Sequence, residues 1–200
     1  MVWRMSEAVR AMTAEAFLDW CLGQEGRWEL VDGVPVAMAG ARRGHDLVVV
    51  NALTSLRPAL RGGPCQPFTG DFAVRIPNGN IRRPDVGVDC GPVDLNSLTA
   101  TDPRLVIEVL SPSTRIFDAI GKLREYQRVP GLRHIILVDP DEPRVWHWRR
   151  PENGPWTDLL LEGLDAVIDL PDLGATLALR DLYEGLTFRP RLRPVPEPPA

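Results

Sequence analysis

Apolar positions at helical spacing and β-prone runs divide the first third of the chain into a helix, a hairpin and a second helix. Residues 13–23 read as a short amphipathic helix, with Thr13 as its N-cap. Two β-prone runs, residues 27–32 and 34–40, meet at an Asp-Gly pair, which is a strong hairpin signal. Apolar residues then recur at close to helical spacing over 45–60, so this segment predicts the second helix.

The middle of the chain has the pattern of strands. Residues 68–76 alternate in their second half, and residues 82–90 form the expected return strand after a turn at 78–80. Residues 104–111 are almost continuously apolar, which is typical of a strand that is covered on both faces. Residues 134–140 have the same character, so a second buried strand is expected there.

A helix is predicted between these two buried strands, from about Arg115 to Val129, with an N-cap in Pro112–Thr114. Strand, helix and strand therefore form one βαβ unit with parallel strands. Residues 144–150 and 157–163 continue the chain as a β meander. The last expected element is a helix around residues 179–186.

These elements predict an α/β (α+β) fold in which a mixed central β-sheet is flanked by helices, with an additional β meander at the C-terminal side. A length of 200 residues with 44% hydrophobic residues fits one domain, expected at 13–188. Residues 1–12 are expected to be an N-terminal extension. Residues 189–200 are proline-rich and are expected to form a disordered tail.

Composition excludes some classes of protein. A net charge of −4 argues against a protein that mainly coats nucleic acid, although a local basic cleft around Arg82, Arg83, Arg115 and Lys122 is compatible with it. No apolar run approaches the roughly 20 residues that span a bilayer, and no signal peptide is evident. The three cysteines indicate neither a zinc site nor a disulfide framework. We expect a soluble cytoplasmic protein without a membrane partner, and a homodimer because symmetric dimers are the commonest oligomers.

Lys122 is the only lysine among 23 basic residues, and its neighbourhood suggests chemistry. A lysine ammonium is a compact point charge that arginine does not replace. Glu108 lies inside a covered strand, where a charge is costly unless it is paired or binds a cation. Asp85 follows Pro84, which favours a sheet edge or bulge where a side chain can point into a cleft. Two such carboxylates are the hard oxygen ligands that Mg²⁺ prefers.

Each of these residues also has a structural interpretation. Glu108 would then pair with an arginine, Asp85 would be solvated, and Lys122 would pair with Asp118 on the helix surface. Glu29 is a third candidate carboxylate, and His45 is either a helix cap or a cleft residue. No phosphate-binding glycine loop and no nucleophile elbow occur, so nucleotide hydrolysis and serine chemistry are not indicated.

A set of motifs over roughly residues 13–186 resembles the Uma-two restriction endonuclease family, part of the PD-(D/E)xK nuclease superfamily. In chain order the motifs are Trp28-ELVDG, Gly44-His45, Arg83-PDVGV, Val106-IEVLSPST, Asp118-AIGKLREY and Ile136-LVDP. The resemblance implies a restriction-endonuclease-like core. It also implies that Asp85 and Glu108 hold a divalent metal, Mg²⁺ or Mn²⁺, with the carbonyl of Val109 as a further ligand, and that Glu29 lines the same site.

The sequence departs from the superfamily pattern at one position. The lysine that usually stands two residues after the second acid is replaced by Leu110. The resemblance therefore implies that Lys122 takes this role from the following helix. The motifs also contain the residues that are expected to contact substrate, which are His45, Arg83, Ser111 and Tyr126.

The function expected from these residues is that of a metal-dependent endonuclease, a hydrolase of phosphodiester bonds in DNA. Glu29, Asp85, Glu108 and Lys122 are its expected catalytic residues. Two alternatives stay open at this point. One is a catalytically inactive module that keeps the fold and binds nucleic acid or protein. The other is a phosphodiesterase that acts on RNA or a small substrate.

Overall fold

The computed structural model describes residues 11–111 and 117–188. The predicted N-cap at Pro112–Thr114, Arg115 of the expected basic cleft, most of the N-terminal extension and the tail at 189–200 lie outside the described residues.

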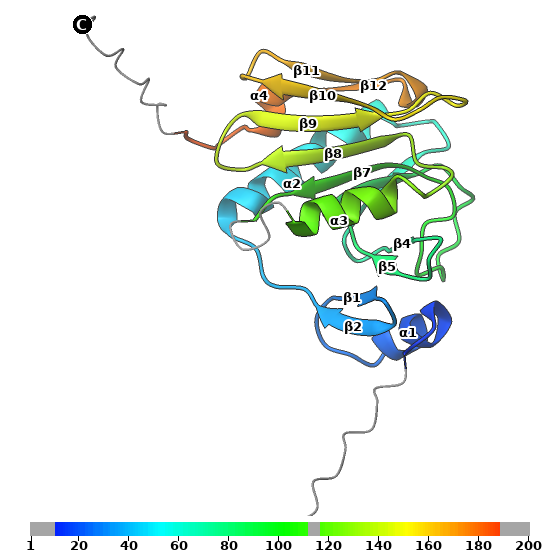
Figure 1. Ribbon diagram of the computed structural model, residues 1–200. Coiled ribbons are helices and arrows are strands. Elements are labelled where there is room, and N and C mark those ends of the chain that lie inside the picture. Colours follow the sequence, from blue (N-terminus) through cyan, green and yellow to red (C-terminus); the bar gives the residue numbers. More distant parts are fainter. Residues whose placement is uncertain (1–10, 112–116, 189–200) are drawn as a thin grey trace, which may run out of the picture.

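A six-stranded mixed sheet forms the centre of the molecule (Figure 1). Its order is β10-β9-β8-β7-β6-β3. In that order the strands are β10 (Thr157–Glu162), β9 (Arg144–Arg149), β8 (His134–Asp139), β7 (Pro103–Val109), β6 (Val86–Asp89) and β3 (Gln66–Thr69). Strands β7 and β8 are parallel and are joined by the helix α3 (Phe117–Tyr126). The predicted βαβ unit is therefore confirmed, and β9 and β10 extend the central sheet as the predicted meander.

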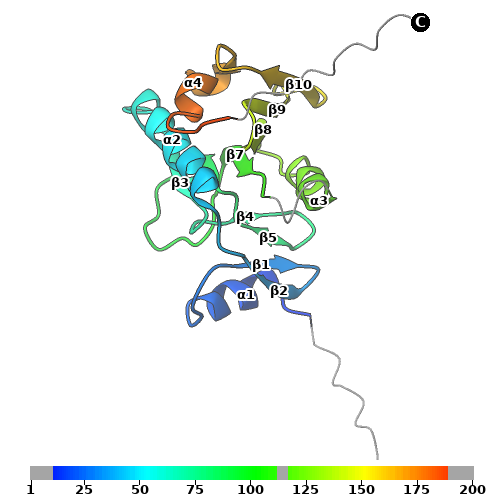
Figure 2. The ribbon, with the colours of Figure 1, turned by 90° about the vertical axis from the view of Figure 1, so that its left-hand side faces the viewer.

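Helices cover both faces of this sheet (Figure 2). The predicted second helix is α2 (Arg43–Ala59), which contacts β6 and β7, and α3 contacts β8. Alternate residues of β7 face different helices because side chains of a strand point to opposite faces. Leu105, Ile107 and Val109 belong to the core cluster on the α2 side, whereas Val106 belongs to the cluster on the α3 side. Within residues 11–111 and 117–188, no helix has the length and apolar character needed to cross a bilayer.

A smaller antiparallel sheet lies beside the central one, at the bottom of Figure 1. Its order is β2-β1-β5-β4, with β2 (Val34–Ala37), β1 (Trp28–Val31), β5 (Ile81–Arg82) and β4 (Val74–Arg75). The predicted hairpin is confirmed, and Asp32 and Gly33 make its turn with positive φ angles of 49° and 79°. The first helix, α1 (Ala14–Cys21), packs on this sheet, and Thr13 caps it as expected.

Two predicted strands are wrong in detail. The segment 68–76 is broken into β3 and β4, and the segment 82–90 is broken into β5 and β6. Strand β5 pairs with β1 in the small sheet, whereas β6 pairs with β7 in the central one. Pro84 lies at the break, where the chain passes from one sheet to the other, because proline donates no hydrogen bond to a ladder.

The C-terminal part contains a hairpin that the sequence analysis missed. Strands β11 (Val167–Leu170) and β12 (Ala175–Ala178) flank the short 3-10 helix η1 (Pro171–Leu173). The predicted helix at 179–186 is shorter than expected and forms α4 (Leu179–Leu182). Alternate residues of the hairpin, among them Ile168, Leu170 and Leu177, join the core on the α2 side.

The expectation of no disulfide is wrong, because Cys65 and Cys90 are joined. Strands β3 and β6 pair Gln66 with Asp89, so the next residues outward, Cys65 and Cys90, stand opposite each other. The two cysteines are far apart in the sequence, and the strand register that places them opposite each other was not predicted. Cys21 is a free cysteine.

Gly87 allows β3 and β6 to pair closely. A Cβ atom on Gly87 would lie 2.1 Å from the ring of Phe68, which is its partner in register. We expect Gly87→Ala to lower the free energy of unfolding by about 1–3 kcal/mol, the usual cost of overpacking. Gly121→Ala on α3 is the matched control, because its Cβ would meet open space. It should raise stability by up to about 1 kcal/mol through helix propensity. Urea unfolding measures both, and an unchanged midpoint for Gly87→Ala would contradict this packing.

Candidate active site

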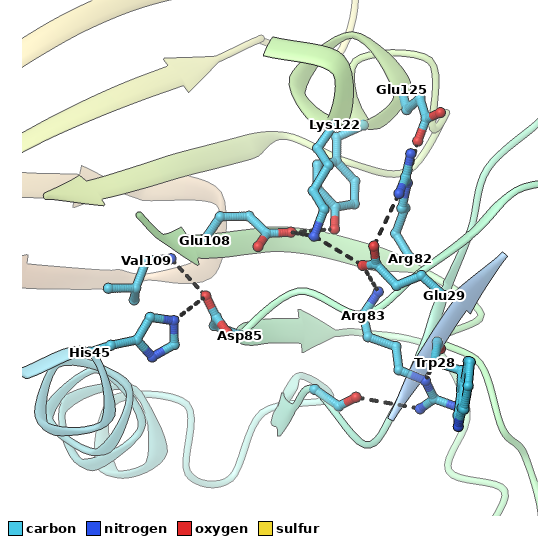
Figure 3. A network of polar contacts seen from close by, with 12 residues as sticks. Trp28, Glu29, His45, Arg82, Arg83, Asp85, Glu108, Val109, Lys122 and Glu125 are labelled. Carbon is cyan, nitrogen blue, oxygen red and sulfur yellow. Dashed lines mark hydrogen bonds and ion pairs between the residues drawn. The ribbon is translucent and has the colours of Figure 1, made fainter. Parts of the chain in front are cut away.

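The register of β6 and β7 brings the two predicted metal ligands together. Val86 pairs with Ile107 in this antiparallel ladder. The next residues outward are Asp85 and Glu108, so the two carboxylates stand on neighbouring chains at the end of β7 (Figure 3). Directly opposite residues in such a pair have Cβ atoms about 4.5–5.5 Å apart. The predicted juxtaposition of an acid from each segment is therefore observed.

A cleft of about 470 Å³ opens over these carboxylates. The small sheet, α2, β7 and α3 all contribute to its walls. Its polar lining residues are Glu29, His45, Arg82, Asp85, Glu108, Ser111 and Lys122. Six polar residues that the sequence assigned to catalysis or substrate thus share one cleft with Arg82.

Glu108 lies on the α3 side of β7, in the alternation that also places Val106 there. Its side chain is 12% exposed, and its Oε1 accepts a hydrogen bond of 2.7 Å from the hydroxyl of Tyr126. Burial, together with the charges of Asp85 and Glu29, raises the pKa of Glu108, and the charge of Lys122 and the Tyr126 hydrogen bond oppose this, so that the pKa is about 7. The carboxylate therefore stands in a site whose negative charge is only partly compensated.

Lys122 reaches into the cleft, as predicted. Its Nζ lies 3.0 Å from Oε1 of Glu29 and 3.6 Å from Oε1 of Glu108. Leu110, at the position where the superfamily has its lysine, also lines the cleft. A helix that returns over the sheet from the end of β7 can thus bring an ammonium to the acid that precedes it. The chemical role of Lys122 stays a prediction.

Glu29 connects the small sheet to this cluster. Its Oε2 accepts a hydrogen bond of 3.0 Å from Arg82, and its Oε1 accepts one of 3.0 Å from the backbone N–H of Arg83. Arg82 in turn donates through Nε to Glu125 at 2.5 Å. Arg82 is 6% exposed, and its pKa lies above the usual value because its two carboxylate partners outweigh the effect of burial.

Asp85 is held from the other side of the cleft. Its Oδ2 accepts a hydrogen bond of 2.8 Å from the backbone N–H of Val109 and lies 3.1 Å from Nε2 of His45. Burial alone would lower the pKa of His45, but the hydrogen bond and charge of Asp85, together with the charge of Glu108, raise it. His45 lies in the first turn of α2, where Arg42 is the N-cap, and its side chain lines the cleft. Of the two expected roles, helix cap or cleft residue, His45 therefore has the second.

Two residues expected to contact substrate are placed elsewhere. Arg83 is buried, and its guanidinium donates to the backbone oxygens of Trp28, Gly70 and Asp71, away from the carboxylates (Figure 3). Tyr126 is fully buried and holds Glu108. One side chain thus anchors the backbone and the other holds the carboxylate, and substrate contact through either of them stays a prediction.

Sequence reasoning also missed two members of the cluster. Arg82 was noted for its charge but not assigned to the site, and Glu125 was not considered. Adjacent residues of a strand point to opposite sides, so only one arginine of the Arg82–Arg83 pair can face Glu29. No sequence signal decides which one it is. Glu125 follows Lys122 by three residues, so it lies near Lys122 on α3, which is a weak signal.

The donor set of the cleft fits a hard cation. Among the residues that the structure describes, no group of three or more His, Cys, Asp or Glu side chains is arranged to hold a metal ion. Mg²⁺ commonly takes only one or two protein carboxylates and completes its shell with waters and phosphate oxygens. Asp85 and Glu108 provide two carboxylates of this kind, and the backbone of Val109 lies next to both.

Comparison with known proteins identifies relatives over most of the chain. The model of the Uma2 family, described as "Putative restriction endonuclease", matches residues 14–180. "Uncharacterized protein slr1290" of Synechocystis is 34% identical over 179 residues, which cover 88% of this chain and 94% of the relative. "Uncharacterized protein sll1609" of the same organism is 28% identical over 145 residues, covering 70% of this chain and 82% of the relative.

A solved structure has the same fold. It is described as a "putative nuclease belonging to DUF820" from Anabaena variabilis, and it superposes with a TM-score of 0.69 at 19% identity. The match covers 86% of this chain and 97% of the other. The nuclease-like fold predicted from the sequence is confirmed by this likeness.

The raised pKa of Glu108 predicts that this carboxylate lowers stability at high pH. Between its unfolded value near 4.5 and its folded value of about 7, the folded state binds the extra proton, so stability is lost as the pH rises. We expect Glu108→Gln to be about as stable as wild type at pH 4.5 and more stable above pH 7, by at most about 3 kcal/mol. Unfolding by urea across this pH range measures the difference. If the difference in unfolding free energy between Glu108→Gln and the wild type does not change with pH, the raised pKa of Glu108 is contradicted.

Proposed function

Since the chain belongs to the Uma2 family, we propose that it is a Mg²⁺- or Mn²⁺-dependent endonuclease that hydrolyses phosphodiester bonds in DNA. The observation that carries this proposal is the meeting of Asp85, Glu108 and Lys122 in one cleft, with 3.6 Å between the ammonium and the nearer oxygen of Glu108. Three separate segments of the chain supply these groups, and no packing requirement of an apolar core explains buried charges of this kind.

In the proposed site Asp85 and Glu108 would hold the ion, with the carbonyl of Val109 as a further ligand. A bound divalent ion lowers the pKa of coordinated water and offsets charge that develops on a phosphate. The protein supplies the orientation of both carboxylates. The Val109 N–H and His45 fix Oδ2 of Asp85, and the Tyr126 hydroxyl fixes Oε1 of Glu108.

Lys122 would position the attacking water or stabilise charge on the scissile phosphate. Glu29 holds its ammonium at 3.0 Å, and Arg82 donates a hydrogen bond to the other oxygen of Glu29. Glu29 therefore acts in this proposal by placing Lys122. His45 and Ser111, which line the cleft, are the side chains left to contact the backbone of the substrate.

The assay that tests the proposal is cleavage of plasmid DNA with Mg²⁺ or Mn²⁺. Removing a group that stabilises developing charge commonly costs about a hundredfold or more in rate. We expect losses of at least about that size for Glu108→Ala, and the same for Lys122→Arg, because a planar guanidinium does not replace a compact ammonium. Arg124→Gln, on the exposed side of α3, is the matched control and should keep activity. If the Glu108→Ala variant still cleaves DNA as the wild type does, the proposed mechanism is contradicted.

Metal binding itself is testable without substrate. Mn²⁺ should raise the melting temperature of the wild-type protein, since a ligand at a hundred times its Kd adds about 2.7 kcal/mol of stability. Asp85→Asn should remove this effect while leaving the fold intact, because the amide can still accept the Val109 N–H through its oxygen. A wild-type protein that gains no stability from millimolar Mn²⁺ would favour the alternative of a non-catalytic binding module. The homodimer stays a prediction that sedimentation can address.

A further inference from the structure

A second cavity, with a volume of about 680 Å³, lies at the other end of the central sheet. Arg104, Arg133 and His134 line it where β7 and β8 begin, whereas the candidate active site lies where β7 ends (Figure 1). Seven residues of extended strand separate the two ends of β7, which is about 20 Å at about 3.3 Å per residue. The cavity is therefore a separate site.

Positive charge gathers on its walls. Arg104, Arg133, Arg149 and Arg150 all line the cavity, and they outnumber its two acidic lining residues, Glu152 and Asp172. Arg104 pairs with Asp102, but Arg133, Arg149 and Arg150 form no ion pair with any carboxylate of the described residues. Burial lowers the pKa of Arg150, and the charge of Arg133 lowers it further, so these two guanidiniums repel each other. An anion placed between them would relieve that repulsion.

The basic wall is held in place by the protein. Arg150 donates to the backbone oxygens of Leu132, Val129 and Pro130 at 2.8, 2.5 and 2.6 Å, and its guanidinium lies 4.8 Å from the ring centre of Trp156. This arrangement fixes the side chain before any ligand arrives. Preorganisation of this kind lowers the entropic cost of binding.

A buried histidine pair supports the same wall. His134 bonds to Asp172 through Nε2 and to His147 through Nδ1, and both histidines are 2% exposed. Both ring nitrogens of His134 are therefore engaged, so this residue positions Asp172 and η1 at the cavity edge instead of acting on a ligand.

Apolar surface completes the cavity. Pro151, Pro171 and the disulfide of Cys65 and Cys90 also line it. Its volume lies in the range of small-molecule sites, about 300–1,000 Å³, which is far larger than a bare phosphate ion needs. Guanidinium forks match phosphate oxygens in geometry and charge.

We propose that this cavity binds a phosphate monoester carried on a small, partly apolar body, the chemistry of a nucleoside monophosphate. Two sources supply that chemistry, a free mononucleotide and the 5′-phosphorylated end of a DNA strand. The proposal does not depend on cleavage of DNA in the other cleft.

Isothermal titration at constant ionic strength tests it with dAMP, inorganic phosphate and deoxyadenosine as probes. We expect dAMP to bind, inorganic phosphate to bind more weakly, and deoxyadenosine not to bind. The double variant Arg133→Gln/Arg149→Gln should weaken dAMP by about tenfold or more, because each lost charge-assisted hydrogen bond is worth more than one factor of ten. A 5′-phosphorylated oligonucleotide that binds more tightly than dAMP identifies the DNA end as the source, and the reverse order identifies the mononucleotide.

Two control variants distinguish binding in this cavity from binding in the candidate active site. Arg124→Gln removes an arginine from α3 outside both cavities, and Glu108→Gln alters the other cleft, so both should bind dAMP as the wild type does. Thr157→Glu is a second test, because Thr157 lines the cavity and is exposed, so a carboxylate there should block dAMP without disturbing the core. The proposal is overturned if dAMP does not bind the wild type, or if the double variant and Thr157→Glu both bind dAMP unchanged.

Discussion

The candidate site depends on a buried cluster of charges in which Glu29 and Glu108 share the ammonium of Lys122, Arg82 pairs with Glu29, and Asp85 pairs with His45. Such charges are costly unless they are paired and hydrogen-bonded. Here the pairing partners come from different parts of the fold: Glu29 and Arg82 from the small sheet, Glu108 from the central sheet and Lys122 from α3. The cluster thus joins the two sheets and α3 and forms the wall of the cleft at the same time. The raised pKa of Glu108 indicates that the protein leaves this charge partly uncompensated, which suits a site for a cation.

The alternation of side chains along β7 determines which of its residues face the core and which face the charged cluster. Leu105 and Ile107 point to the apolar core under α2, and Glu108 points to α3, where Tyr126 and Lys122 meet it. A slip of one residue in register would turn every side chain of the strand to the opposite face. Glu108 would then enter the apolar core, and the ladder with β6 would no longer set Asp85 opposite it. The apolar packing of β7 therefore also fixes the geometry of the carboxylates.

Much of this arrangement is predictable from the sequence, and the limits have physical causes. A charged residue inside a covered strand and a solitary lysine on the next helix pointed to Glu108 and Lys122, since each is unusual where it stands. The sequence did not show that Arg82, and not Arg83, would pair with Glu29, because the alternation of side chains in a strand cannot be assigned to a face without a known register. Tyr126 was expected to contact substrate because it shares a helical stripe with Lys122. Such a stripe predicts the direction of a side chain but not how deeply it is buried, and Tyr126 is fully buried. The Cys65–Cys90 pair depends on the register of β3 and β6, and the β11–β12 hairpin consists of strands too short to give a clear period.

The central claim is that Asp85 and Glu108 hold a divalent cation beside Lys122. The most direct measurement is a crystal structure of the protein soaked in Mn²⁺, with the metal located by its anomalous scattering. We expect one strong anomalous peak within coordination distance of a carboxylate oxygen of Asp85 and one of Glu108, with the Lys122 ammonium still hydrogen-bonded to Glu29. An unoccupied cleft at saturating Mn²⁺, or a metal bound only elsewhere on the molecule, would contradict it.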